Sequence, residues 1–143
     1  MKNYLLMFLV LFGFSINTIA QSFTDPWTAK QLMGTKVLAD RLKQNQMKNT
    51  VVINIGPDAI IKGSFNAGPG QDEASILKMK NHLSKLSKST EVVLYCGCCP
   101  FVKCPNIRPA FKTLIDLGFK NAKLLNIPQN IKVDWIDKGY PVN

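Results

Sequence analysis

The stretch Glu91-Val-Val-Leu-Tyr-Cys-Gly-Cys-Cys-Pro-Phe-Val-Lys-Cys-Pro-Asn-Ile-Arg-Pro-Ala-Phe111 decides the fold. Its first six residues are apolar and β-branched almost throughout, which is typical of a parallel strand buried on both faces. Pro109 suits the first turn of a helix. Apolar residues then recur at helical spacing, up to a glycine where a helix C-terminus is usual: Ala110, Phe111, Leu114, Ile115, Leu117 and Gly118. The stretch therefore predicts a strand, a cysteine-rich loop and a helix.

Strand and helix patterns alternate on both sides of this unit. The expected strands cover residues 50–55 and 122–125, with a brief strand within 62–70, and the expected helices begin at Thr35, run from Asp72 to about Ser87, and cover residues 131–135. Alternation of this kind implies parallel strand pairing with helices at the crossovers. The predicted fold class is α/β, a small three-layer α/β/α sandwich around a parallel sheet.

The N-terminal residues have the composition of a secretory signal. Lys2 is the only charge among the first twenty residues, an apolar run covers residues 4–16, and Thr18-Ile-Ala20 offers small residues for cleavage. The run is shorter than the roughly 20 residues that span a bilayer. We expect residues 1–20 to be a signal peptide and residues 21–143 to be a single domain. The mature protein would be exported, periplasmic or secreted, without stable membrane insertion; an uncleaved anchor is the alternative.

The net charge of +9 raises the question of a nucleic-acid partner. The basic residues are mostly lysines scattered singly along the chain, and Arg41 and Arg108 are the only arginines. Base recognition relies heavily on arginine, and basic arms usually form runs. We therefore expect no nucleic-acid partner, but a solvated lysine surface with some attraction for anions.

Cys96 is the leading candidate for a nucleophile. Ligands of parallel sheets bind beyond the carboxyl ends of the strands, where Cys96 ends the expected strand. A helix N-terminus after the loop presents backbone N–H groups and the positive end of its dipole, and both favour a thiolate over a thiol. Arg108 adds a permanent positive charge if it folds inward.

These residues resemble the rhodanese family of sulfurtransferases. The resemblance rests on residues 92–96, 108–119 and 122–125 and on the closing Asp134-Trp-Ile-Asp-Lys-Gly-Tyr-Pro-Val142, with residues 51–56 and 61–67 standing where the family has its upstream motifs. It implies a rhodanese-like sandwich in which Cys96 carries sulfane sulfur as a persulfide. By the same resemblance, Gly97, Cys98, Cys99 and Arg108 bind the anionic sulfur. The implied partner is a small sulfur-containing anion or a thiol acceptor, and no cofactor is implied.

The chain departs from the family pattern in the loop and in the strand before it. Eleven residues separate Cys96 from Arg108, so this loop is longer than is usual in the family. Val102 stands where a phosphatase loop of the same fold carries arginine, which disfavours phosphatase chemistry. Asn54 and Gly56 replace an aspartate and an arginine that pair in the family, so we expect the salt bridge to be absent or replaced by neutral hydrogen bonds.

Cys98, Cys99 and Cys104 leave three alternatives open. A Cys99–Cys104 or Cys98–Cys104 disulfide would stiffen the loop in an oxidising compartment. Alternatively, one of these thiols resolves a persulfide or sulfenate on Cys96 by forming a disulfide, as in a thiol–disulfide redox module. In the third alternative, Cys96, Cys98, Cys99 and Cys104 bind zinc or cuprous copper without catalysis.

The remaining polar and aromatic candidates are expected to be structural. His82, the only histidine, falls on a lysine-rich helix face and is expected to be solvated rather than a catalytic base. Trp27 and Trp135 are expected to pack on the core or to frame the mouth of the site. Asp134 and Asp137 are expected at the surface near the start of the last helix.

Overall fold

The fold is built on one parallel sheet. The computed structural model describes residues 25–143, so the signal peptide expected at residues 1–20 lies outside the described residues. Five strands pair in the order β1-β5-β4-β2-β3: β1 is Leu32–Gly34, β2 Thr50–Asn54, β3 Phe65–Asn66, β4 Glu91–Tyr95 and β5 Asn121–Asn126. Every strand pairing is parallel, and β4 lies at the centre between β2 and β5.

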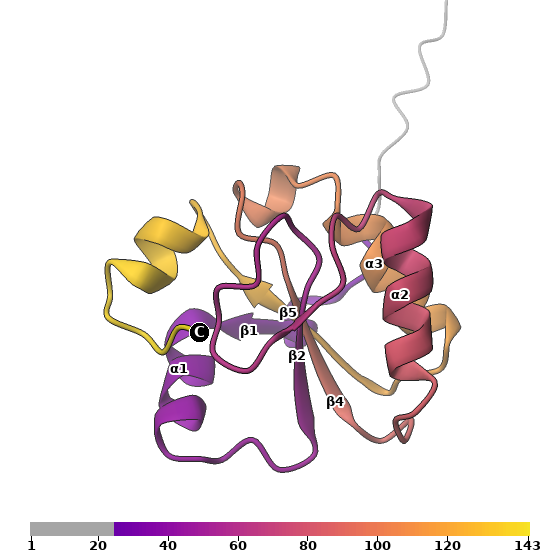
Figure 1. Cartoon of the computed structure of the whole chain (residues 1–143), viewed down its shortest axis with the longest axis horizontal. Helices are drawn as coiled ribbons and strands as arrows, with labels where there is room; N and C mark the ends of the chain where they lie inside the picture. The colour runs from indigo at the N-terminus through magenta and orange to yellow at the C-terminus, as the bar shows by residue number, and fades with distance from the viewer. Residues whose placement is uncertain (1–24) are drawn as a thin grey trace, which may run out of the picture.

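Helices cover both faces of this sheet, as Figure 1 shows. α2 (Glu73–Leu83) and α3 (Ile107–Asp116) cover one face, whereas α1 (Thr35–Lys43) and the short segment η3 (Lys132–Ile136) cover the other. Two single helical turns, η1 (Ala29–Gln31) and η2 (Phe101–Lys103), lie in loops. This arrangement confirms the predicted α/β/α sandwich. Within residues 25–143, no helix has the length and apolar character needed to cross a membrane.

The central strand β4 contributes to the core on both faces of the sheet. Val92, Leu94 and Cys96 belong to the core under α2 and α3, whereas Val93 and Tyr95 belong to the core under α1 and η3. All five side chains are buried. Successive strand residues point to opposite faces, so an unbroken apolar run needs a helical layer on each side to exclude water. This alternation places the Cys96 side chain on the α2–α3 side.

The predicted elements are confirmed, with local corrections. α2 ends at Leu83, before the expected Ser87, although Leu86 still packs against the core. The sequence pattern does not predict β1, because its three residues follow a turn-rich segment and owe their extended form to pairing with β5 at the sheet edge. Ile115, assigned to the apolar stripe of α3, is 41% exposed.

Asp134 is buried, which corrects the expectation of a surface residue. It is 4% exposed, and its carboxylate accepts hydrogen bonds from the backbone N–H groups of Gln129 and Asn130 at 2.7 and 3.1 Å. A buried carboxylate is tolerated where N–H donors satisfy it. Asp137 is exposed as expected and pairs with Lys132 at 2.7 Å.

Both tryptophans pack on the core, as the sequence predicts. Trp27 meets Phe111 edge to face, with the ring centroids 5.7 Å apart. Trp135 is fully buried and donates its indole N–H to the Pro141 carbonyl at 2.9 Å. Trp27 packs in the core under α2 and α3, and Trp135 packs in the core under α1 and η3.

Candidate functional site

Cys96 lies directly beyond the carboxyl end of β4, where the sequence places it. Its side chain is 1% exposed, and a Cβ atom added to Gly56 in the loop after β2 would stand 2.9 Å from its sulfur. The loops that follow β2 and β4 therefore meet over the same end of the sheet (Figure 1). Only a residue without a side chain fits at position 56 without displacing the Cys96 sulfur.

Three residues, Cys104, Cys98 and Asn106, provide hydrogen bonds to the Cys96 sulfur. The Cys104 thiol has the largest effect and lowers the Cys96 pKa to about 5, assisted by the Cys98 backbone N–H, the Asn106 side-chain amide and the Cys98 thiol. The Asn106 Nδ2 atom lies 3.5 Å from the sulfur. Burial opposes this shift, because a charged thiolate loses hydration. The direction agrees with the expected thiolate, but the donors come from the loop itself and from Asn106.

The neighbouring thiols stay protonated around this thiolate. Burial is the largest cause that raises the pKa of Cys98, to about 12, and its contacts with Cys99 and Cys96 add to the effect. The Cys104 pKa is also raised, chiefly because its thiol proton is shared with the Cys96 sulfur. At neutral pH the cluster thus holds one thiolate, on Cys96, together with thiols on Cys98 and Cys104.

Three of the four cysteine sulfurs form a compact group. The sulfurs of Cys96, Cys98 and Cys104 all lie within 4.8 Å of one another, and the Cys96–Cys98 separation is 3.4 Å. Cys99 lies outside this group, although its sulfur is 3.2 Å from that of Cys98. No disulfide joins any of the four cysteines in this structure, so the proposed disulfides stay predictions. Cys96 and Cys104 are buried, whereas Cys98 is exposed.

The long insertion after Cys96 is an ordered loop. The Phe101 N–H donates to the Ile127 carbonyl at 3.1 Å, and the Phe101 ring lies 6.4 Å from that of Trp27. At the near end, the Gly97 carbonyl accepts a hydrogen bond from the Ile131 N–H at 2.9 Å. These contacts fix the loop at Gly97 and at Phe101 and hold Cys98 and Cys99 between them.

Arg108 lies in the first turn of α3, directly after this loop. Its guanidinium donates to the Asp25 carboxylate at 2.7 Å and to the Val102 carbonyl at 3.0 Å. It also lies 5.3 Å above the Trp27 ring. These contacts show that Arg108 has a structural role, because it connects α3 to Asp25, Val102 and Trp27. Its role in binding an anion stays a prediction.

A small cavity opens beside Cys98. Its volume is about 180 Å³, and its lining residues come from the loop after β2, the cysteine loop and the start of the last helix: Pro57, Asp58, Ile60, Gly97, Cys98 and Ile131. The buried thiolate of Cys96 lies 3.4 Å behind the Cys98 sulfur. Cys98 therefore lines the cavity and contacts Cys96, which is not among the lining residues.

Asn106 is a site residue for which the sequence predicts no role. It immediately precedes α3, the N-cap position, but its side chain does not cap the helix. Instead its carbonyl accepts from the Gln71 N–H at 3.3 Å while its amide donates to Cys96. Asparagine just before a helix is a recognisable N-cap signal, but its contact with Cys96 depends on the tertiary fold.

Asn54 shows the neutral hydrogen bonding expected at the departure from the family pattern. Its fully buried side chain donates to the Gly56 backbone carbonyl at 2.8 Å and to the Asn66 side-chain oxygen, Oδ1, at 2.9 Å. It also accepts from the Gly56 N–H at 3.2 Å. Asn54 therefore shapes the turn after β2 that brings Gly56 against Cys96.

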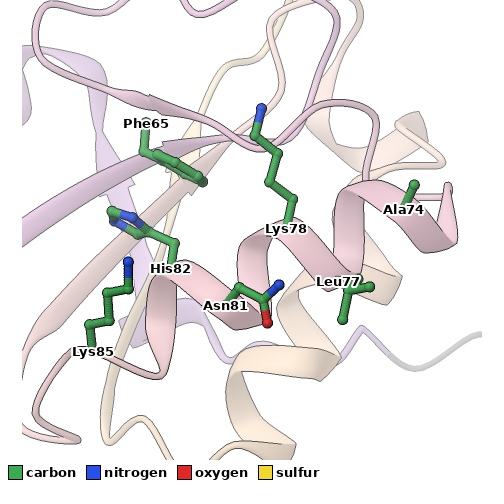
Figure 2. Close-up of a pocket in the computed structure, with 7 residues that line it drawn as sticks. All are labelled: Phe65, Ala74, Leu77, Lys78, Asn81, His82 and Lys85. Atoms are coloured by element: carbon green, nitrogen blue, oxygen red, sulfur yellow. The ribbon is translucent and has the colours of Figure 1, made fainter.

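His82 belongs to a different surface of the molecule. Its ring is stacked on Phe65, with the ring centroids 3.9 Å apart, and lines an open pocket of about 400 Å³ along α2. Figure 2 shows the two rings facing each other. It is half-buried rather than fully solvated, which modifies the sequence-based expectation. Burial lowers the His82 pKa, with a smaller contribution from the Lys85 charge. Its packing on Phe65 accounts for its position.

No protein-family model matches this chain, and no curated protein matches it. The protein is therefore described by its fold and by the residues of its candidate site. It is a small α/β domain with a five-strand parallel sheet and a cysteine cluster directly after β4.

Proposed function

We propose that this protein is a rhodanese-like sulfurtransferase that carries sulfane sulfur on Cys96. The observation that carries the proposal is the convergence of hydrogen-bond donors from three residues on the Cys96 sulfur beyond the end of a parallel strand. Such donors hold the sulfur as a nucleophilic thiolate, and ligands of parallel sheets bind at this edge. The resemblance of the chain to rhodaneses, including its W…GxPV ending, adds independent support.

The first step loads sulfur onto Cys96. The thiolate attacks the outer sulfur of an anionic donor such as thiosulfate, a new sulfur–sulfur bond forms, and sulfite departs with the electron pair of the broken bond. The charges balance, because one thiolate and one dianion give one persulfide anion and one dianion. The donors that hold the thiolate are placed to stabilise the persulfide anion as well.

The second step returns Cys96 to its starting state. A thiophilic nucleophile attacks the outer sulfur of the persulfide, and the electron pair of the sulfur–sulfur bond returns to Cys96 as a thiolate. The cavity beside Cys98 is the route by which donor and acceptor approach. Because Cys96 is buried and does not line this cavity, the neighbouring Cys98 side chain must move aside in both steps.

Sulfur uptake measured by intact mass tests this function. We expect the reduced protein, incubated with thiosulfate and freed of excess reagent, to gain one sulfur atom, and Cys96→Ser to gain none. Val102→Ser is the matched control, because Val102 is a half-exposed residue of the same loop whose backbone alone makes the contact with Arg108. Equal uptake by Cys96→Ser and by the parent protein overturns the assignment.

The 3.4 Å contact between the Cys96 and Cys98 sulfurs favours thiol–disulfide exchange as a second candidate function. In that reaction the two thiols give up two electrons and two protons to a disulfide of a partner, which becomes two thiols. Peptide mapping without reduction, after equilibration with oxidised glutathione, tests it. A Cys96–Cys98 bond supports this function, whereas bonds confined to Cys99 and Cys104 exclude it.

A further inference from the structure

We propose that Cys96, Cys98 and Cys104 form a binding site for one cuprous ion. The observation is the mutual separation of their three sulfurs, all within 4.8 Å. This inference goes beyond sulfur transfer, because a bound cation engages the same Cys96 sulfur and keeps it from reacting.

The separations suit a single cation held by three thiolates. A thiolate sulfur lies about 2.3 Å from a bound d10 cation such as zinc, which sets the sulfurs of a trigonal site about 4 Å apart. The Cys96–Cys98 separation of 3.4 Å and the 4.8 Å limit on the others bracket this value. Closing the site around an ion therefore requires only small side-chain movements.

The backbone already holds the three ligands in place. Cys96 directly follows the central strand β4, and the Gly97 carbonyl accepts a hydrogen bond from the Ile131 N–H at 2.9 Å. Cys104 is fully buried, and its N–H donates to the Phe101 carbonyl at 3.2 Å at the end of η2. A site assembled in advance loses less conformational entropy when the ion binds.

The donor set selects a soft monovalent cation. Thiolates prefer cuprous copper and zinc to hard cations. Structural zinc sites are almost always four-coordinate, whereas the sulfur of Cys99 lies outside the group of three. The single histidine of the chain is stacked on Phe65 and is not a member of this group. Three sulfur ligands fit the low coordination number that cuprous copper accepts.

The burial of the site suits an ion that must be shielded from water and oxidants. Cys96 and Cys104 are buried, and Cys98 alone of the three is exposed, beside the cavity of about 180 Å³. Copper delivered by a thiol or thioether carrier can thus meet the Cys98 sulfur first and then pass inward. The exchange needs no redox step, because the ion arrives and stays as Cu(I). Cys98 and Cys104 each lose a proton as their sulfurs bind the ion, and these protons pass to the ligands that the carrier gives up or to water.

The test is an anaerobic titration of the full reduced chain with Cu(I), in competition with a chromophoric cuprous chelator. We expect one Cu(I) per chain, with three sulfur neighbours in the X-ray absorption spectrum. Loss of an outer-shell partner costs about 10- to 100-fold in metal affinity, so Cys104→Ser and Cys98→Ser should each weaken binding by at least about 100-fold. Because Cys98 is exposed, its variant is expected to fold, which circular dichroism checks.

Cys99→Ser is the matched control and should bind Cu(I) as the parent chain does. A parallel titration with Zn(II) identifies the ion. Tighter binding of zinc than of Cu(I), or an equal loss in Cys99→Ser, overturns the three-sulfur cuprous site, as does binding of less than one Cu(I) by the parent chain. No sulfur donor is present in these titrations, so their outcome is separate from that of the sulfur-uptake experiment.

Discussion

The acidity of Cys96 is the property of a single residue that is most open to measurement. In the metal-free protein its pKa is lowered to about 5, while that of Cys98 is raised to about 12 and that of Cys104 is also raised. Tyr95, the other titratable neighbour, stays neutral because burial raises its pKa. The thiolate should therefore be present throughout the physiological pH range.

We expect the ultraviolet thiolate absorbance of the parent protein to rise with a midpoint near pH 5. Cys96→Ser should lack this transition. Since the folded pKa lies below that of an unfolded cysteine, about 8.5, this group stabilises the fold fully above about pH 8.5, and its contribution disappears as the pH falls through about 5. A parent chain whose first thiol titrates only above pH 8 contradicts the proposed nucleophile.

Asn106 should act on Cys96 through its side-chain amide. Asn106→Ala removes the donor 3.5 Å from the Cys96 sulfur and the acceptor of the Gln71 N–H. We expect a higher Cys96 pKa and, because a partly buried N–H loses its acceptor, a loss of about 1–3 kcal/mol in the free energy of unfolding. Absorbance titration and urea denaturation measure the two effects.

Asn81→Ala provides the comparison for Asn106→Ala. Asn81 is exposed on α2, so its replacement should change the stability by no more than about 0.5 kcal/mol. It should leave the titration of Cys96 as it is in the parent protein. If Asn106→Ala gives the parental pKa, the amide does not hold the thiolate.

Two loops meet at the site, and Gly56 is the point where they touch. A Cβ atom there would lie 2.9 Å from the Cys96 sulfur, so Gly56→Ala must push the loop after β2 away from the cysteine loop. Overpacking of this kind costs about 1–3 kcal/mol. We expect thermal unfolding at lower temperature and slower sulfur uptake by Cys96.

Gly34→Ala is the matched change, because its Cβ would meet only Val37 at an ordinary 3.9 Å. It should unfold within a few degrees of the parent protein, and its sulfur uptake should be the same. Parental behaviour of Gly56→Ala in both assays is the result that contradicts tight packing between the two loops.

The elements of the fold follow largely from local sequence. The apolar runs of β2 and β4 are too continuous for half-exposed strands, and the stripe of α3 ends at Gly118, whose φ of 80° suits glycine. β1 does not follow from local sequence, since its extended form depends on pairing with β5, which is distant in the chain. Asp134 was misassigned because two backbone N–H donors satisfy it inside the fold.

The candidate site could be predicted only in part from the sequence, because some of its contacts, like the pairing of β1, depend on the tertiary fold. Cys96 could be assigned because its place at the end of a buried strand is a local pattern. The contact with Asn106 and the grouping of Cys104 with Cys96 arise from the folding of the insertion onto Ile127 and Trp27. The family resemblance implies that Arg108 binds the anionic sulfur. In the structure its guanidinium pairs with Asp25, and the anion-binding role stays a prediction.

Across the whole molecule, two consecutive residues at the end of the central strand have different roles on opposite faces of the sheet. Cys96 belongs to the candidate site, and Tyr95 holds a neighbouring loop in place. Cys96 meets the thiol cluster on the α2–α3 side of the sheet, and Tyr95 reaches the opposite side. The Tyr95 hydroxyl accepts hydrogen bonds from the N–H groups of Ile60 and Ile61 at 3.0 and 3.2 Å and also contacts Ser64 at 3.0 Å. One buried phenol thus holds the loop that carries Gly56 and a wall of the cavity.

Tyr95→Phe should therefore destabilise the whole domain. It leaves the N–H groups of Ile60 and Ile61 without their acceptor, at a cost of about 1–3 kcal/mol for each buried group that finds no water. We expect a lower urea midpoint and faster hydrogen exchange at these two amides. Tyr140→Phe is the control, because its ring keeps the edge-to-face contact with Trp135, with centroids 5.2 Å apart. Equal stability of the two variants would show that the loop is held by its backbone bridge to the C-terminus, between Ile61 and Val142, rather than by the Tyr95 hydroxyl.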